Sequence, residues 1–196
     1  IRFTNSMLQH FWDDKDGNLY FTSDDHEQLI VRTKSLYDLA IPSGNSVAAS
    51  NLLRLYYLTE NNDYLDKAER IMKAGARTAA ENPFGFGQLL VSIYLYIKKP
   101  VEIIIIRNVE NKHDSPMLTW LNRQFVPNGI IATVNGNLQL EELQKYPFFM
   151  NRIPSSKEEK GKSVAEYALV CRNFTCSLPI YSIQDLELHI ANTPSS

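Results

Sequence analysis

The sequence predicts a mixed fold, in which helical hairpins are followed by a small three-stranded, mainly parallel α/β unit. Two observations predict it. Apolar residues recur at helical spacing through the first half, and the short polar turns between them are typical of antiparallel helix pairs. The period then changes at Val101–Ile106, a nearly continuous β-branched run typical of a strand buried on both faces. We place the boundary between Lys99 and Pro100, which gives a helical domain at 1–99 and an α/β domain at 100–196.

The first half contains four stretches with helical spacing. A polar turn at Asp13–Asn18 ends the first, and short extended pieces follow at Leu19–Thr22 and Leu29–Val31. Asn82 and Pro83 end the third, because the residue before a proline is biased away from helical backbone. We expect helices at residues 2–13, 47–59, 63–80 and 84–97.

The second half has the order strand, helix, strand, which is a βαβ unit with parallel strands. Ser115 and Pro116 open its helix, where proline is tolerated because the N–H it lacks has no partner in a first turn. Ser182 and Asp185 have the spacing of a reciprocal N-terminal cap, so a final helix begins there. We expect strands at 101–106, 130–134 and 165–171, a helix at 116–125, and a disorder-prone segment at 155–162.

Composition argues against several classes of protein. The formal charge of -2 leaves no dominant basic patch, so we expect no nucleic-acid partner. No run of about 18 apolar residues is present, so we expect no membrane span. No signal peptide is visible, and we expect a cytoplasmic protein. The four histidines are scattered, with none in ligand spacing to another, so we predict neither a metal site nor a cofactor.

The start of the second expected helix is the first candidate for a site. Ser43, Gly44, Asn45 and Ser46 crowd one turn, which is more small and polar residues than one helix cap requires. Free N–H groups and hydroxyls at this point could hold a sugar hydroxyl or an anion. The alternative is structural: Gly44 permits a turn, Pro42 stiffens it and Asn45 caps the helix.

Asp38 lies just before that turn and is the candidate catalytic residue, as an acid, a base or a hydrogen-bond acceptor. The nearest cations in the sequence are Arg32 and Lys34, so an ion pair is its alternative role. Acid–base catalysis would need burial that shifts the pKa of the carboxyl group.

Trp12 and Asp14 place an aromatic ring beside carboxylates near the end of the first expected helix. Such mixtures line carbohydrate sites, where rings stack on sugar faces and acids hold hydroxyls. A core aromatic followed by solvated aspartates gives the same pattern. Asp14, Asp16 and Asn18 alternate as in a calcium loop, but no Glu closes a twelve-residue loop, so we predict no calcium site.

The two cysteines, Cys171 and Cys176, are too few for a disulfide framework, and their spacing differs from that of a C-x-x-C redox pair. Our first interpretation is a pair of reduced thiols near the end of a strand. A disulfide or a metal clip is the alternative, and zinc would need two further ligands.

Three stretches are specific enough to suggest a family: Leu29–Lys34, Tyr37–Ala48 and Val170–Cys176. They resemble the C-terminal region of the spermatogenesis-associated, thioredoxin-domain-containing protein family, and the resemblance covers most of the chain. It implies that an N-terminal thioredoxin-like domain precedes a six-hairpin toroid similar to N-acylglucosamine 2-epimerases, and that a small α/β region follows. This chain would then hold the last hairpins and the α/β region.

The resemblance also implies where a site would lie, at the toroid mouth where loops before the inner helices converge. The implied residues are Asp38, Ser43, Asn45 and Ser46, together with Trp12 and Asp14. The expected function is binding of a carbohydrate or another small ligand, with isomerase- or epimerase-like chemistry in the full protein. The rival is a non-catalytic scaffold that packs against the thioredoxin-like domain, which is the expected partner.

The chain begins Ile1-Arg2-Phe3 and follows helical spacing from there, so we interpret it as a fragment that starts within a longer protein. A fragment of a toroid is expected to be inactive alone and to expose apolar helix faces, which favours self-association. The helix faces expected to be exposed, and to be buried in such a dimer, carry Leu52, Leu55, Leu89 and Tyr94.

Overall fold

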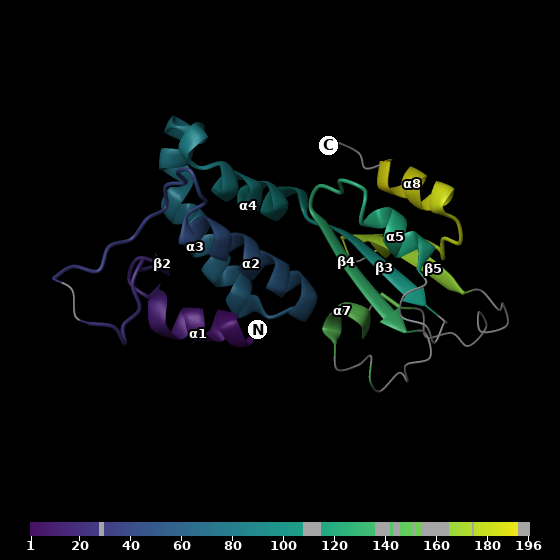
Figure 1. Ribbon diagram of the computed structural model, residues 1–196, viewed down its shortest axis with the longest axis horizontal. Coiled ribbons are helices and arrows are strands. Elements are labelled where there is room, and N and C mark those ends of the chain that lie inside the picture. Colours follow the sequence, from purple (N-terminus) through teal and green to yellow (C-terminus); the bar gives the residue numbers. More distant parts are fainter. Residues whose placement is uncertain are drawn as a thin grey trace. The chain divides into compact units, whose positions relative to one another are not determined.

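The computed structural model describes residues 1–27, 30–107, 115–135, 142, 146–150, 152–153, 165–173 and 175–191. The chain divides into two compact units, Ile1–Lys98 and Lys99–Ser196. Figure 1 shows that helices dominate the first unit and that the second contains a sheet with helices. The prediction of a mixed helical and sheet fold is therefore confirmed.

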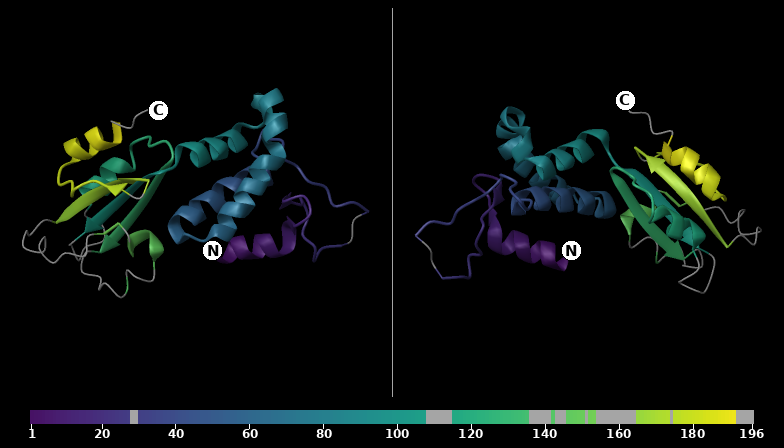
Figure 2. Two further views of the ribbon diagram at one scale, coloured as in Figure 1. Left: turned by 180° about the vertical axis from the view of Figure 1, so that it is seen from behind. Right: turned by 45° about the horizontal axis from the view of Figure 1, so that its top comes forward.

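The first unit contains the four expected helices, and α2 packs against both α3 and α4 (Figure 2). Trp12 and Asp13 were expected at the end of the first helix, but they pair antiparallel with Leu19 and Asn18 instead. The element bounds are α1 (Arg2–Phe11), β1 (Trp12–Asp13), β2 (Asn18–Leu19), α2 (Gly44–Thr59), α3 (Asn62–Glu81), η1 (Pro83–Gly85) and α4 (Gly87–Lys98).

Local signals explain these bounds. The Ser43 hydroxyl accepts a hydrogen bond from the Ser46 N–H and caps α2. Glu60 ends the helix in the left-handed region at φ 56°. Gly75 lets α3 approach α4, because a Cβ atom at this position would lie 2.4 Å from a methyl carbon of Leu89.

The core of this unit is made by the facing sides of α2, α3 and α4. Leu52 and Leu89 are fully buried in it, so the expectation that they lie on exposed faces is wrong. Leu55 is half-buried, and Tyr94 is half-exposed as expected. The buried apolar residues of the three helices are Ala48, Ala49, Leu52, Leu53, Tyr57, Tyr64, Ala68, Ile71, Met72, Ala79, Leu89 and Leu95.

The second unit is built on a sheet with the strand order β4-β3-β5-β6. Strands β3 and β4 are parallel, with Val101 opposite Gly129, so the predicted βαβ unit is confirmed. Its elements are β3 (Val101–Arg107), α5 (Pro116–Leu121), β4 (Gly129–Asn135), α7 (Pro147–Met150), β5 (Glu166–Arg172), β6 (Thr175–Cys176) and α8 (Ile183–Ala191).

Two details of the α/β prediction are wrong. The sheet has four strands among the described residues, and β5 runs antiparallel to β3, so only the β3–β4 pair is parallel. The added strand β6 forms because the chain turns back at Asn173, at φ 48°, and pairs Cys176 with Cys171. This pairing brings the two sulfur atoms together in a disulfide, so the reduced-thiol interpretation is also wrong.

Successive residues of β3 point to opposite faces of the sheet. Ile103 and Ile105 belong to one face, where they form a core with Leu121 of α5 and Leu186 of α8. Glu102 belongs to the other face, where its carboxylate binds the guanidinium of Arg152. The predicted cap of the final helix is confirmed, and the predicted segment at 155–162 lies outside the described residues. None of the described helices is long and apolar enough to cross a membrane.

Candidate functional site

Asp38 joins the starts of two helices. Its Oδ1 accepts a hydrogen bond from the Ser43 N–H at 2.8 Å, immediately before α2. Its Oδ2 accepts from the N–H groups of Gln88 and Leu89, at 2.8 and 3.4 Å, in the first turn of α4. A carboxylate in this position satisfies backbone donors that have no partner within the helix and interacts favourably with the positive end of the helix dipole.

These contacts fix the charge state of Asp38. Burial by itself would raise the pKa of the carboxyl group, but hydrogen bonds from Ser43, Ser46, Gln88 and Leu89 outweigh it, and the pKa is lowered overall. The group is therefore an ionised acceptor at neutral pH, whereas a general acid needs a pKa raised towards 7.

The cations nearest to Asp38 in the sequence are engaged elsewhere. Arg32 donates to the backbone carbonyls of His10 and Thr22, at 3.0 and 2.7 Å. Lys34 forms ion pairs with Asp13 and Asp16. The alternative role of Asp38 as an ion-pair partner is therefore replaced by a role as a helix-capping acceptor.

The three polar residues at the start of α2 are also bonded inside the fold. Ser43 and Ser46 are buried, and their hydroxyl oxygens lie 2.8 Å apart. The Asn45 side chain accepts from the Leu19 N–H at 2.7 Å and donates to the carbonyls of Leu19 and Ser35, both at 2.9 Å. This turn thus fastens β2 and the segment around Ser35 to α2.

Trp12 and Asp14 form a second polar group. The indole N–H of Trp12 donates to Asp14 Oδ1 at 2.8 Å. Lys67 and Arg70, both on α3, approach the face of the indole ring, with centroid distances of 5.5 and 5.3 Å. The side chain of Asp14 is 91% exposed, so this corner is open to solvent.

The structure links the two groups of expected site residues through β2. Trp12 is opposite Leu19 in the β1–β2 pair, and the backbone of Leu19 binds the side chain of Asn45. The sequence did not predict a role for the backbone amides of Gln88 and Leu89, which lie about 50 residues from Asp38 in the chain. No local pattern signals that contact, because it depends on how α4 returns to the start of α2.

The pair formed by Asp13 and Lys34 predicts a pH dependence. The hydrogen bond from Lys34, followed by one from the Lys15 N–H, lowers the pKa of Asp13 from 3.8 to about 2. A lowered pKa in the folded state stabilises the fold above the ordinary pKa, and this stabilisation is lost as the pH falls from 3.8 towards 2. We expect Asp13→Asn to flatten the fall in melting temperature over this range, with exposed Asp66→Asn as the control. Parallel profiles for wild type and Asp13→Asn would contradict the assignment.

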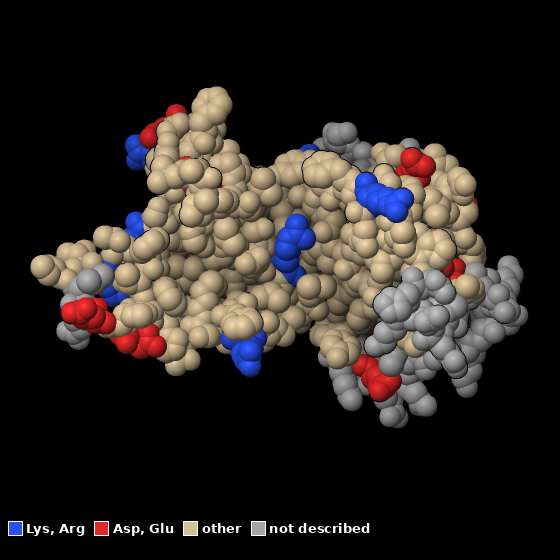
Figure 3. All heavy atoms as spheres, in the orientation of Figure 1, with Lys and Arg blue, Asp and Glu red and all other residues tan. Residues whose placement is uncertain are grey.

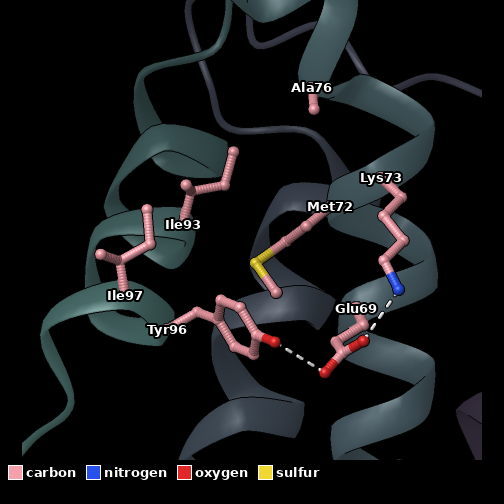
Figure 4. Close-up of a pocket in the computed structure, with 7 residues that line it drawn as sticks. All are labelled: Glu69, Met72, Lys73, Ala76, Ile93, Tyr96 and Ile97. Atoms are coloured by element: carbon pink, nitrogen blue, oxygen red, sulfur yellow. Dashed lines mark hydrogen bonds and ion pairs between the residues drawn. The ribbon is translucent and has the colours of Figure 1, made fainter.

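An apolar pocket of about 200 Å³ lies between α3 and α4 (Figure 4). At its polar side, the Tyr96 hydroxyl donates to Glu69 Oε1 at 2.8 Å, and Lys73 pairs with Glu69 Oε2 at 2.9 Å. The hydrogen bond to Glu69 is the first cause of the raised pKa of Tyr96. The lining residues are Glu69, Met72, Lys73 and Ala76 from α3, with Ile93, Tyr96 and Ile97 from α4.

The two helices beside the pocket differ in surface chemistry, because α3 carries exposed charged side chains such as Lys73 and Arg77, whereas the exposed side of α4 is largely apolar. On the face in Figure 3, the charged side chains of the described residues are scattered and most of the surface is uncharged. Helix α4 contributes three exposed apolar residues, Val91, Tyr94 and Ile97. We call these residues the outer face of α4.

The comparisons with known proteins point to one group of relatives. No protein-family model matches the chain. The chain is 25% identical to spermatogenesis-associated protein 20 of Homo sapiens over 182 residues, which are 92% of this chain and 22% of that protein. The chain is similar to spermatogenesis-associated protein 20. The protein of that name from Rattus norvegicus is 28% identical over 182 residues, with the same shares of each chain covered.

A protein of a nematode has a comparable match. An uncharacterized protein of Caenorhabditis elegans is 27% identical over 179 residues, which are 90% of this chain and 23% of that protein. The chain therefore spans less than a quarter of the length of the relatives that it matches.

Proposed function

We propose that the helical unit is a non-catalytic docking unit of a longer protein, and that a further apolar helix packs on the outer face of α4 and into the adjacent pocket. The observation that carries this proposal is that α4 is largely apolar on its exposed side as well as on its buried side. A helix of this kind is normally buried all round, whereas an ordinary surface helix has one polar face.

The inner and outer sides of α4 are both largely apolar but differ in burial. Leu89 and Leu95 are buried against α2 and α3, whereas Val91, Tyr94 and Ile97 are 52%, 51% and 64% exposed. Exposed apolar side chains that line up on one helix face mark an interaction surface. The pocket adds a concave acceptor of about 200 Å³, a volume that suits a single large apolar side chain.

The greater length of the relatives indicates where the helix proposed to pack on α4 would come from. The matched proteins are more than four times as long as the matched region, so most of their chain lies outside it. We propose that a helix from such a segment covers α4. The toroid implied by the family resemblance would provide such a helix as the neighbouring hairpin. A thioredoxin-like domain is the rival occupant, and it belongs to the scaffold role expected from the sequence.

The hydrogen bonds of the polar turn at the start of α2 support a structural role, rather than a catalytic one, for its residues. Asp38, Ser43, Asn45 and Ser46 all make hydrogen bonds to groups of their own fold. We therefore assign Asp38 to helix capping and propose no acid–base step through it.

Sedimentation of the purified chain tests the docking surface. Without its helical partner, the outer face of α4 is expected to pair with a second copy, so the apparent mass should rise with concentration. The double variant Tyr94→Lys/Ile97→Lys should remain monomeric, because both side chains are exposed and the substitutions place charge on the contact.

The control is Phe125→Lys/Leu178→Lys, which changes two exposed apolar residues of the other unit, 90% and 86% exposed. The control should associate as the wild type does. A wild-type chain that stays monomeric at every concentration, or a control that loses association equally, would count against the docking surface.

A second candidate is binding of a carbohydrate or another small polar ligand at Trp12 and Asp14. It is favoured by an indole ring that lies beside an exposed carboxylate and two cations, Lys67 and Arg70. A thermal-shift screen of monosaccharides, amino sugars and sugar phosphates tests it. A stabilisation lost in Trp12→Leu but kept in Phe3→Leu, an exposed aromatic of α1, would support this candidate, and a flat response would remove it.

A further inference from the structure

The end of α1 and the bend that follows β2 bring together an imidazole and two carboxylates. We propose that His10, Asp24 and Asp25 form a binding site for one divalent transition-metal ion, with Zn²⁺ as the fitting ion. The proposal is independent of the docking surface on α4 and of the candidate ligand site at Trp12.

The distances suit a single ion. His10 Nδ1 lies 2.8 Å from Asp24 Oδ1 and 4.0 Å from Asp25 Oδ2, and the three atoms all lie within 4.8 Å of one another. Two atoms bound about 2.1 Å from one zinc ion are separated by roughly 3.0–4.2 Å. A small side-chain adjustment therefore places all three atoms around one ion.

The charge balance also favours a cation. Among the described residues, the ion-pair contacts of Asp24 and Asp25 are with His10, and neither carboxylate pairs with a lysine or arginine. His26 adds a weaker electrostatic attraction to Asp25. With a neutral imidazole, the three groups carry two negative charges and offer one nitrogen and two oxygen ligands. A divalent ion neutralises these charges, which a single protonated histidine does not.

Groups outside the ligand set hold the three residues in place. Arg32 donates to the backbone carbonyl of His10 at 3.0 Å and to that of Thr22 at 2.7 Å, and so ties α1 to the bend. The Ser23 hydroxyl donates to Asp25 Oδ1, which leaves Oδ2 directed to the site. Such supporting contacts orient metal ligands and raise affinity.

The ligand chemistry selects the class of ion. Imidazole nitrogen suits zinc and its neighbours in the transition series, whereas calcium and magnesium prefer oxygen ligands alone. The side chains of Asp24 and Asp25 are 52% and 63% exposed, so water can reach the open coordination positions. Three protein ligands and an open position are the arrangement of zinc sites that bind a further molecule.

Competition with a chromogenic zinc chelator tests the site on the whole chain, with Zn²⁺ alone as the probe. We expect one ion per chain and a rise in melting temperature with zinc that magnesium does not reproduce. His10→Ala and Asp25→Asn should each weaken zinc binding at least about tenfold. Asp25→Asn changes a largely exposed side chain, so it keeps the test valid if His10→Ala fails to fold.

His26→Ala is the matched control, because His26 is exposed on the same bend and is not one of the three ligands. It should bind zinc as the wild type does. The proposal is overturned if the wild type binds no zinc, if His10→Ala and Asp25→Asn both retain wild-type affinity, or if His26→Ala loses as much affinity as His10→Ala.

Discussion

Replacing Arg152 by alanine is expected to lower the free energy of unfolding of the α/β unit by about 3–5 kcal/mol. Arg152 and Glu102 are both 4% exposed, and two hydrogen bonds of 2.5 and 2.9 Å join them. Arg152 also donates to the Phe148 carbonyl at 3.0 Å, which ties α7 to the sheet. The alanine variant leaves the Glu102 carboxylate buried without its cation, and this unpaired charge lowers the free energy of unfolding.

Chemical denaturation followed by tryptophan fluorescence measures this effect. Trp120 packs on the core of the α/β unit, so replacing Trp12 by Phe in the background makes the signal specific for that unit. The double variant Glu102→Leu/Arg152→Met is the control, because replacing both partners of a buried pair by apolar residues is often neutral or stabilising. A loss below about 1 kcal/mol for Arg152→Ala would mean that the pair does not hold α7 on the sheet.

Asp38→Ala is expected to lower the free energy of unfolding of the helical unit by about 2–3 kcal/mol. The substitution removes the acceptor for three backbone N–H groups, those of Ser43, Gln88 and Leu89. Two helix starts lose their anionic partner in one change. The measurement is denaturation followed by Trp12 fluorescence, with Trp120 replaced by Phe.

Two controls separate capping from a general effect of charge. Asp38→Asn keeps an oxygen acceptor and should cost less than Asp38→Ala. Asp66→Ala changes an exposed carboxylate of α3 and should alter stability by less than about 0.5 kcal/mol. If Asp38→Ala unfolds as the wild type does, Asp38 does not stabilise the contact between α2 and α4. Asp38 would then again be a candidate catalytic residue.

Much of the fold could be predicted because apolar spacing identifies helices and buried strands directly. The four helices of the first unit and the parallel β3–β4 pair follow from that pattern. The direction of β5 does not, since a buried strand has the same composition whether it runs parallel or antiparallel to its neighbour. The hairpin with β6 and the disulfide depend on the turn at Asn173, which the apolar pattern does not encode.

The candidate site was harder to predict, because its residues act through distant backbone groups. The structural interpretation of the sequence named Asn45 as the cap of α2, and that detail is wrong. The cap is Ser43, whose hydroxyl accepts from the Ser46 N–H. The partners of Asp38 and Asn45 lie far along the chain, at Gln88 and Leu19, and only the packed structure identifies them. The apolar residues of α4 are plain in the sequence, but their division into a buried and an exposed side is not.

The measurement that tests the docking proposal most directly is the accessibility of α4 in the longest protein that the gene encodes. A cysteine introduced by Tyr94→Cys can be labelled with a maleimide in this chain and in that protein, and Arg77→Cys, 92% exposed on α3, serves as the control. We expect labelling at position 94 to be at least about tenfold slower in the longer protein, and labelling at position 77 to be unchanged. Equal rates at position 94 in both proteins would contradict the proposal, because the outer face of α4 would then have no helix packed on it.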